Sequence, residues 1–167
     1  MNILIDLNCL ANQAEAIIEA ADITLGPRDL CRHGFFRRYI TDDQLFKIIE
    51  GRTSFWEDQS VFPWAHDLYA VCLAFGRCAV ALPEEYPHTP DVNEATRWLI
   101  DTAHIKCQTL AGAIWFVAGH SALITQSLDV AGLYRQNGGR ALTLDLNTTA
   151  TSSYVESKVT EFLEGAF

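Results

Sequence analysis

Residues 3–21, ILIDLNCLANQAEAIIEAA, carry the pattern from which a helical fold is predicted. Their apolar side chains recur every three or four positions, at Ile3, Leu7, Leu10, Ala14, Ile17, Ile18 and Ala21. This spacing is typical of one face of a helix, with Glu15, Glu19 and Asp22 on the opposite, solvated side. A short strand through Ile3, Ile5 and Leu7 is the alternative for the first residues.

Helical signals continue along the chain. Thr41 and Gln44 are spaced as a capping box, and Gly51 stands where the helix that they start would end. Residues 65–82 are apolar nearly all round, which predicts one buried helix that Pro83 stops. Helices are expected from Asp91 to about Lys106 and onward to about Arg135. The last helix is expected to start at Thr151 or Ser152 and to end at Gly165.

The uncharged run 107–128, CQTLAGAIWFVAGHSALITQSL, is long enough to span a bilayer, which takes about 20 residues. It is interrupted by polar side chains, namely Gln108, Thr109, His120, Ser121, Thr125, Gln126 and Ser127. We therefore expect a helix buried at the centre of the protein rather than a membrane span.

One segment favours a strand. Residues 141–147, ALTLDLN, alternate leucines with polar neighbours, and the only partner that the sequence offers is the segment 3–7. The two either pair or are both non-strand. The predicted fold class is therefore all-α: a single helical domain over residues 1–167, with six to eight helices and at most one small two-stranded β element.

Composition limits the function. The 167 residues carry 12 Lys and Arg against 21 Asp and Glu, a net charge of −9, and 49% are hydrophobic. Such a chain has the apolar material for a core, and its charge disfavours nucleic acid or an anionic membrane as a partner. Five cysteines without a secretory leader predict a reducing cytoplasm. The cysteines show no metal-binding spacing and are interpreted as core residues, with raised pKa values at Cys72 and Cys107.

No catalytic motif stands out, and neither a metal nor a cofactor is expected. The best metal candidates are His66 with Asp67 and Asp101 with His104. In the second pair the carboxylate stands three residues before the histidine, so both lie on the same helix face and could share an ion. A hydrogen bond between Asp101 and His104 is the simpler interpretation of the second pair.

Two acidic, aromatic segments are the candidate partner-binding residues: Trp56, Glu57 and Asp58, then Glu84, Glu85 and Tyr86. Aromatic side chains anchor interfaces, and carboxylates around them select a basic partner. If residues 65–82 form one helix, the two segments lie about 27 Å apart at its ends. The alternative is that the aromatic residues fold inward and the acids only keep the protein soluble.

In size, acidity and helicity the chain resembles the helical immunity proteins of bacterial contact-dependent growth inhibition and related polymorphic toxin systems. These proteins share no diagnostic motif, so no functional residues carry over. The resemblance implies a non-enzymatic cytoplasmic protein that neutralises a basic toxin domain, a tRNA-cleaving nuclease being one candidate. The alternatives are a small helical metal-binding protein or enzyme that uses His66, Asp67, Asp101 and His104, and a helical oligomerisation or adaptor module.

Overall fold

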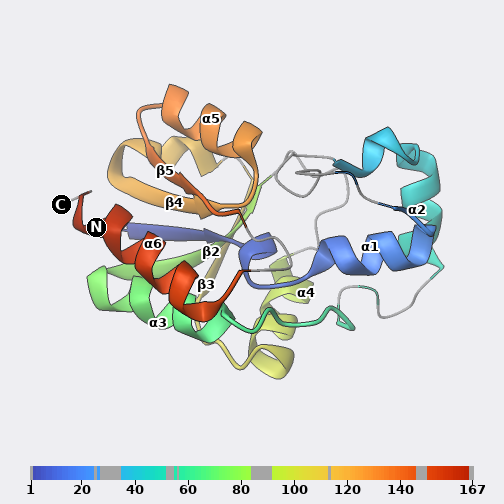
Figure 1. Cartoon of the computed structure of the whole chain (residues 1–167), viewed down its shortest axis with the longest axis horizontal. Helices are drawn as coiled ribbons and strands as arrows, with labels where there is room; N and C mark the ends of the chain where they lie inside the picture. Colours follow the sequence, from blue (N-terminus) through green and yellow to red (C-terminus); the bar gives the residue numbers. More distant parts are fainter. Residues whose placement is uncertain are drawn as a thin grey trace.

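A five-stranded parallel β-sheet with helices on both faces forms the body of the protein (Figure 1). The strand order is β3-β2-β1-β4-β5. This computed structural model describes residues 2–24, 26, 35–51, 55, 57–83, 92–112, 114–145 and 150–165. Because the protein contains a five-stranded sheet, the prediction of an all-α fold is wrong.

Strands and helices alternate along most of the chain, as parallel pairing requires. The strands are β1 (Asn2–Asp6), β2 (Arg77–Pro83), β3 (Gln108–Gly112), β4 (Ser121–Thr125) and β5 (Arg140–Thr143). The α-helices are α1 (Gln13–Ala21), α2 (Asp42–Glu50), α3 (Ala65–Phe75), α4 (Val92–Arg97), α5 (Leu128–Gln136) and α6 (Ser152–Glu164). Short 3₁₀ segments are η1 (Leu7–Cys9), η3 (Phe35–Arg38) and η5 (Ile114–His120), and η4 (Trp98–Thr102) is a π-helical turn.

The central strand β1 pairs with β2 on one side and β4 on the other. Ile3 is opposite Cys78 in β2 and Ala122 in β4. All five residues of β4 are buried. Strands that are covered on both faces carry near-continuous apolar runs, such as residues 122–124, so they lose the alternating pattern that marks a half-exposed strand.

Two apolar clusters cover the two faces of the sheet. Ile3 and Ile5 point to one face, where they pack with residues of α3 and α6 such as Leu68 and Val159. Leu4 points to the other face and belongs to the cluster built by α5 and η5. The alternation of β1 residues between the two clusters follows from the two-residue period of a strand.

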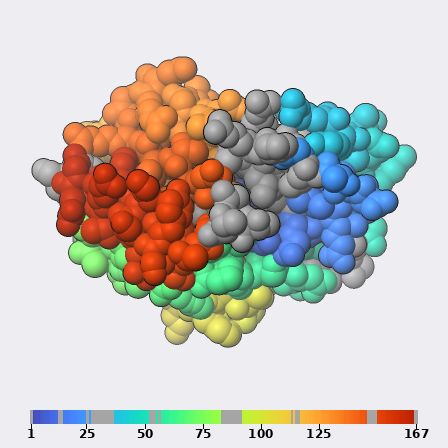
Figure 2. All heavy atoms as spheres, viewed as in Figure 1, coloured from blue at the N-terminus to red at the C-terminus, as the bar shows by residue number. Residues whose placement is uncertain are grey.

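Helices α1 and α2 form a separate unit between β1 and α3. They share their own apolar cluster, which contains Ile17 and Leu45. An antiparallel bridge between Ala11 and Val61 joins the two chain segments that connect this unit to the sheet. In Figures 1 and 2 the two helices lie at the end of the molecule toward which β1 runs, opposite α6. This unit therefore stands beyond the carboxyl ends of the strands.

Several sequence assignments change in the structure. The helical spacing of residues 3–21 covers β1, η1 and α1 instead of one helix. Residues 65–82 are not one helix, because α3 ends at Phe75 and β2 follows after Gly76. The run 107–128 contains β3, η5 and β4 instead of a buried helix. The strand predicted at 141–147 exists as β5, Arg140–Thr143, but its partner is β4, while the segment 3–7 contributes to the central strand β1.

The helix ends were predicted better than the strands. Thr41 and Gln44 form the capping box of α2, and the Thr151 side chain caps α6, which ends before Gly165. Gly51 follows α2 with φ −70°, so it is not the left-handed cap that its identity suggests. Among the described residues, no helix is long and apolar enough to cross a membrane. The cytoplasmic location stays a prediction.

Candidate active site around Asp6

A fully buried carboxylate, Asp6, lies at the carboxyl end of the central strand β1. Thr125, also 0% exposed, ends the neighbouring strand β4. The chain adds β2 and β3 on one side of β1 and β4 and β5 on the other. In open parallel sheets the crevice outside the carboxyl ends at such a switch point is the usual ligand site. Asp6 is therefore in the position where this fold type places its chemistry.

Hydrogen bonds fix both carboxylate oxygens of Asp6. The backbone N–H and the side-chain amide of Asn8 donate to Oδ1, at 3.1 and 3.2 Å. The Thr125 hydroxyl donates to Oδ2 at 2.6 Å. Asp6 also caps the 3₁₀ turn η1 through the Asn8 bond, so the chain turns sharply where the strand ends.

The turn after β4 completes the cluster. Thr125 Oγ1 accepts a hydrogen bond from the Ser127 backbone N–H at 3.1 Å, and Ser127 Oγ in turn accepts from Val130 N–H at 3.2 Å as the cap of α5. The Gln126 side-chain amide donates to the Asn8 carbonyl and ties the two turns together. We call Asp6, Asn8, Thr125, Gln126 and Ser127 the Asp6 cluster.

Cys9 adjoins the cluster but is a poor nucleophile. Its thiol lies 3.8 Å from the Ile124 carbonyl, and the Trp64 indole N–H donates to the Cys9 carbonyl at 3.2 Å. Burial raises the pKa of the Cys9 thiol well above its usual value, and the negative charge of Asp6 raises it further. A thiol that stays protonated is a poor nucleophile.

The other described cysteines agree in part with the sequence interpretation. Cys72 is buried and Cys107 half-buried, and both thiols have raised pKa values, about 11 for Cys107, where burial is the main cause. Cys78 differs, because a hydrogen bond from Cys72 lowers its pKa. Cys31 lies outside the described residues.

The Asp6 cluster does not fit a divalent metal ion. Mg²⁺ and Ca²⁺ prefer several oxygen ligands, with carboxylates foremost. The cluster offers one carboxylate, whose two oxygens already accept hydrogen bonds from the protein, beside two amides and two hydroxyls. No three His, Cys, Asp or Glu side chains gather into a possible metal site in the described part of the chain.

The metal site proposed from sequence is also not formed. His66 and Asp67 lie in the first turn of α3, whereas Asp101 lies in η4 and His104 follows it. His104 has a left-handed backbone, with φ 54°, and its Nδ1 lies 3.2 Å from the Ile100 carbonyl. The expected bond between Asp101 and His104 is thus replaced by one to the backbone.

The predicted partner-binding residues are described only in part. Glu57 and Asp58 are exposed, and Glu57 forms an ion pair with Arg97 at 3.5 Å. Trp56, Glu84, Glu85 and Tyr86 lie outside the described residues. Because α3 ends at Phe75, a single helix does not separate the two segments. An interface at these six residues stays a prediction.

Thr125→Val gives a first test of the cluster. Valine keeps the shape but removes the donor to a buried carboxylate, so we expect a loss of about 2 kcal/mol in the free energy of unfolding. Thr125→Ser keeps the hydroxyl and should cost only about 0.8 kcal/mol for the lost methyl group. Urea denaturation at pH 7 measures both. Equal losses in the two variants would show that the hydroxyl contributes nothing.

Sequence reasoning missed the Asp6 cluster, although signals for it were present. Asp6 follows the apolar run Ile3–Ile5, and Thr125, Gln126 and Ser127 follow the apolar residues of β4. A short apolar run that ends in a polar residue is the pattern of a buried parallel strand with its functional edge. In a chain interpreted as helical, Asp6 was only a charge inside an apolar stretch.

Comparisons with known proteins bear on the fold. No family model and no curated protein matches the chain. A solved haloacid dehalogenase-like hydrolase from Streptococcus pneumoniae has a similar structure, with a TM-score of 0.58 at 12% sequence identity over 96% of this chain and 90% of that one. The resemblance to helical immunity proteins, and the non-enzymatic toxin-neutralising function inferred from it, are therefore wrong. The chain shares its fold with a hydrolase.

Proposed function

We propose that the protein is a hydrolase in which the Asp6 carboxylate is the nucleophile. The observation that carries this proposal is the position of Asp6, buried at the carboxyl end of the central strand with both oxygens oriented by the protein. The hydrolase with the similar fold supports an enzymatic role. Aspartate carboxylates serve as covalent nucleophiles in several enzyme classes.

The reaction has two steps. One oxygen of Asp6 forms a bond to the electrophilic atom of the substrate, and the leaving group departs with the electron pair of the broken bond. Water then cleaves the covalent intermediate, which regenerates the carboxylate and releases the product and a proton. The hydrogen bonds from Asn8 and Thr125 hold the carboxylate in one orientation, which lowers the entropic cost of attack.

Access to Asp6 requires a conformational change, because the residue is 0% exposed. The unit of α1 and α2 stands beyond the strand ends and has its own apolar cluster, so it can shift without disrupting the sheet core. Closure of such a unit over a bound substrate excludes water during the first step.

Rapid-quench mass spectrometry tests the proposal. The protein is incubated with p-nitrophenyl phosphate and, separately, with a 2-haloacid, and the digested peptides are searched for a covalent adduct. We expect turnover of at least one probe and an adduct on Asp6. Turnover without an adduct would refute the covalent role of Asp6. No turnover with either probe or with a broader panel of esters would refute the hydrolase assignment.

A further inference from the structure

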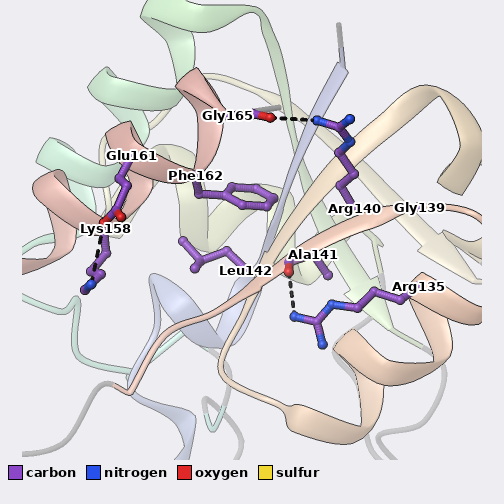
Figure 3. Close-up of a pocket in the computed structure, with 9 residues that line it drawn as sticks. All are labelled: Arg135, Gly139, Arg140, Ala141, Leu142, Lys158, Glu161, Phe162 and Gly165. Carbon is purple, nitrogen blue, oxygen red and sulfur yellow. Dashed lines mark hydrogen bonds and ion pairs between the residues drawn. The ribbon is translucent and has the colours of Figure 1, made fainter. Parts of the chain in front are cut away.

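A groove runs along the edge strand β5, between α6 and the C-terminal end of α5. It encloses about 630 Å³, within the range of small-molecule sites. Figure 3 shows its lining residues: Arg135, Gly139, Arg140, Ala141, Leu142, Lys158, Glu161, Phe162 and Gly165. The groove begins beside the first residue of β5, whereas Asp6 lies at the carboxyl end of β1. It is therefore separate from the candidate active site.

The floor of the groove is apolar and its rim is basic. Leu142 and Phe162 lie side by side in the groove, half-buried against the main core (Figure 3). Arg135, Arg140 and Lys158 also line the groove, and Glu161, the one acidic side chain among the described lining residues, pairs with Lys158 at 3.6 Å. Three cations against one carboxylate give a local charge of +2 in a chain whose net charge is −9.

The two arginines are held by the backbone rather than by acids. Arg135 donates to the Ala141 carbonyl at 2.6 Å, and Arg140 donates to the Gly165 carbonyl at 3.0 Å. Neither forms an ion pair with any carboxylate among the described residues. A guanidinium has five N–H donors, so each arginine keeps donors for a ligand while its position is fixed.

We propose that the groove binds a small organic anion with an apolar or aromatic body. The flat apolar body would lie on Leu142 and Phe162, and the anionic group would accept hydrogen bonds from Arg140, while Arg135 adds positive charge from the other side of β5 (Figure 3). Guanidinium groups bind carboxylate, sulfonate or phosphate oxygens with two parallel hydrogen bonds, and this geometry selects anions over neutral ligands of the same shape.

Binding is tested with naphthalene-2-sulfonate, which combines an aromatic body with a charge that no hydrolase removes. We expect saturable shifts of the amide NMR signals of Gly139, Leu142 and Phe162 in the full chain. Neutral 2-naphthol and inorganic sulfate should each bind at least about tenfold more weakly, since each lacks one half of the ligand. Added salt should weaken binding of the sulfonate.

Arginine variants test whether the groove is the binding site. Arg135→Gln combined with Arg140→Gln should weaken naphthalene-2-sulfonate binding at least about tenfold. Arg140→Gln alone, which removes one side-chain bond to a carbonyl, is the milder variant and should show an intermediate loss. Arg77→Gln removes the same charge from an exposed residue at the start of β2 and should change nothing. No shifts at the groove, equal binding of 2-naphthol, or equal losses in Arg77→Gln would overturn the proposal.

Discussion

Asp6→Asn is expected to abolish hydrolysis, with a fall in kcat of about 10⁴-fold or more, the range seen when a hydrolase loses its nucleophile. The amide has nearly the same shape as the carboxylate and can accept from Asn8 N–H through its oxygen. It is uncharged and a far weaker nucleophile, so the covalent intermediate does not form. Steady-state turnover of whichever probe the wild-type protein accepts measures the effect.

The loss of activity should be separable from a loss of stability. In Asp6→Asn the side-chain amide can donate to Thr125 Oγ1, which keeps the contact between β1 and β4. We expect the free energy of unfolding to fall by about 1–3 kcal/mol, because the Thr125 hydroxyl proton loses the carboxylate oxygen that accepted it. A folded variant with at least a tenth of wild-type turnover would contradict the nucleophile assignment.

Gly139→Ala is expected to destabilise the protein by about 3 kcal/mol, the upper end of the cost of overpacking a core. A Cβ at residue 139 would lie 2.4 Å from two ring carbons of Tyr134 and 3.0 Å from Ala118 Cβ. Tyr134 is fully buried and its hydroxyl is hydrogen-bonded to Ser121, so the ring cannot move aside without breaking that bond. Chemical denaturation monitored by circular dichroism measures the loss.

Gly132→Ala is the matched control, because it makes the same chemical change seven residues before the crowded site. A Cβ at residue 132, inside α5, meets no atom within 4 Å. Alanine restrains the unfolded chain and favours helix, so this variant should gain about 0.5–1 kcal/mol. The two alanine variants are thus expected to shift stability in opposite directions, and a shift of the same sign in both would contradict the contacts given for Gly139.

The helices of this protein could be predicted where their ends carry polar caps. Thr41 with Gln44, and Thr151, satisfy backbone N–H groups through their own side chains, which is local chemistry that a sequence shows directly. The strands could not be predicted in the same way. Their hydrogen-bond partners are far away in the chain, as Ile3 with Ala122 illustrates.

Strands that are buried on both faces also lack the alternation of apolar and polar residues by which a strand is recognised in a sequence. Ser121–Thr125 is buried at every position, so its apolar pattern is continuous and reads equally well as part of a buried helix. In residues 3–21 the helical spacing spans a strand, a turn and a helix because about two thirds of the positions are apolar, so a helical register is easily found across all three. Asp6 and Thr125 are in contact because β1 and β4 are neighbours in the sheet, and no local sequence pattern predicts that contact.

The bridge between Ala11 and Val61 has a consequence for how such a protein evolves. The segment that leaves the sheet after β1 and the segment that returns before α3 lie side by side at this bridge. There the Asn12 N–H donates to the Ser60 carbonyl and the Phe62 N–H donates to the Leu10 carbonyl, each at 2.9 Å. Insertions, deletions or wholesale exchange of the intervening helices leave the strand register intact. Selection can thus replace α1 and α2 while the hydrogen bonds around Asp6 stay the same.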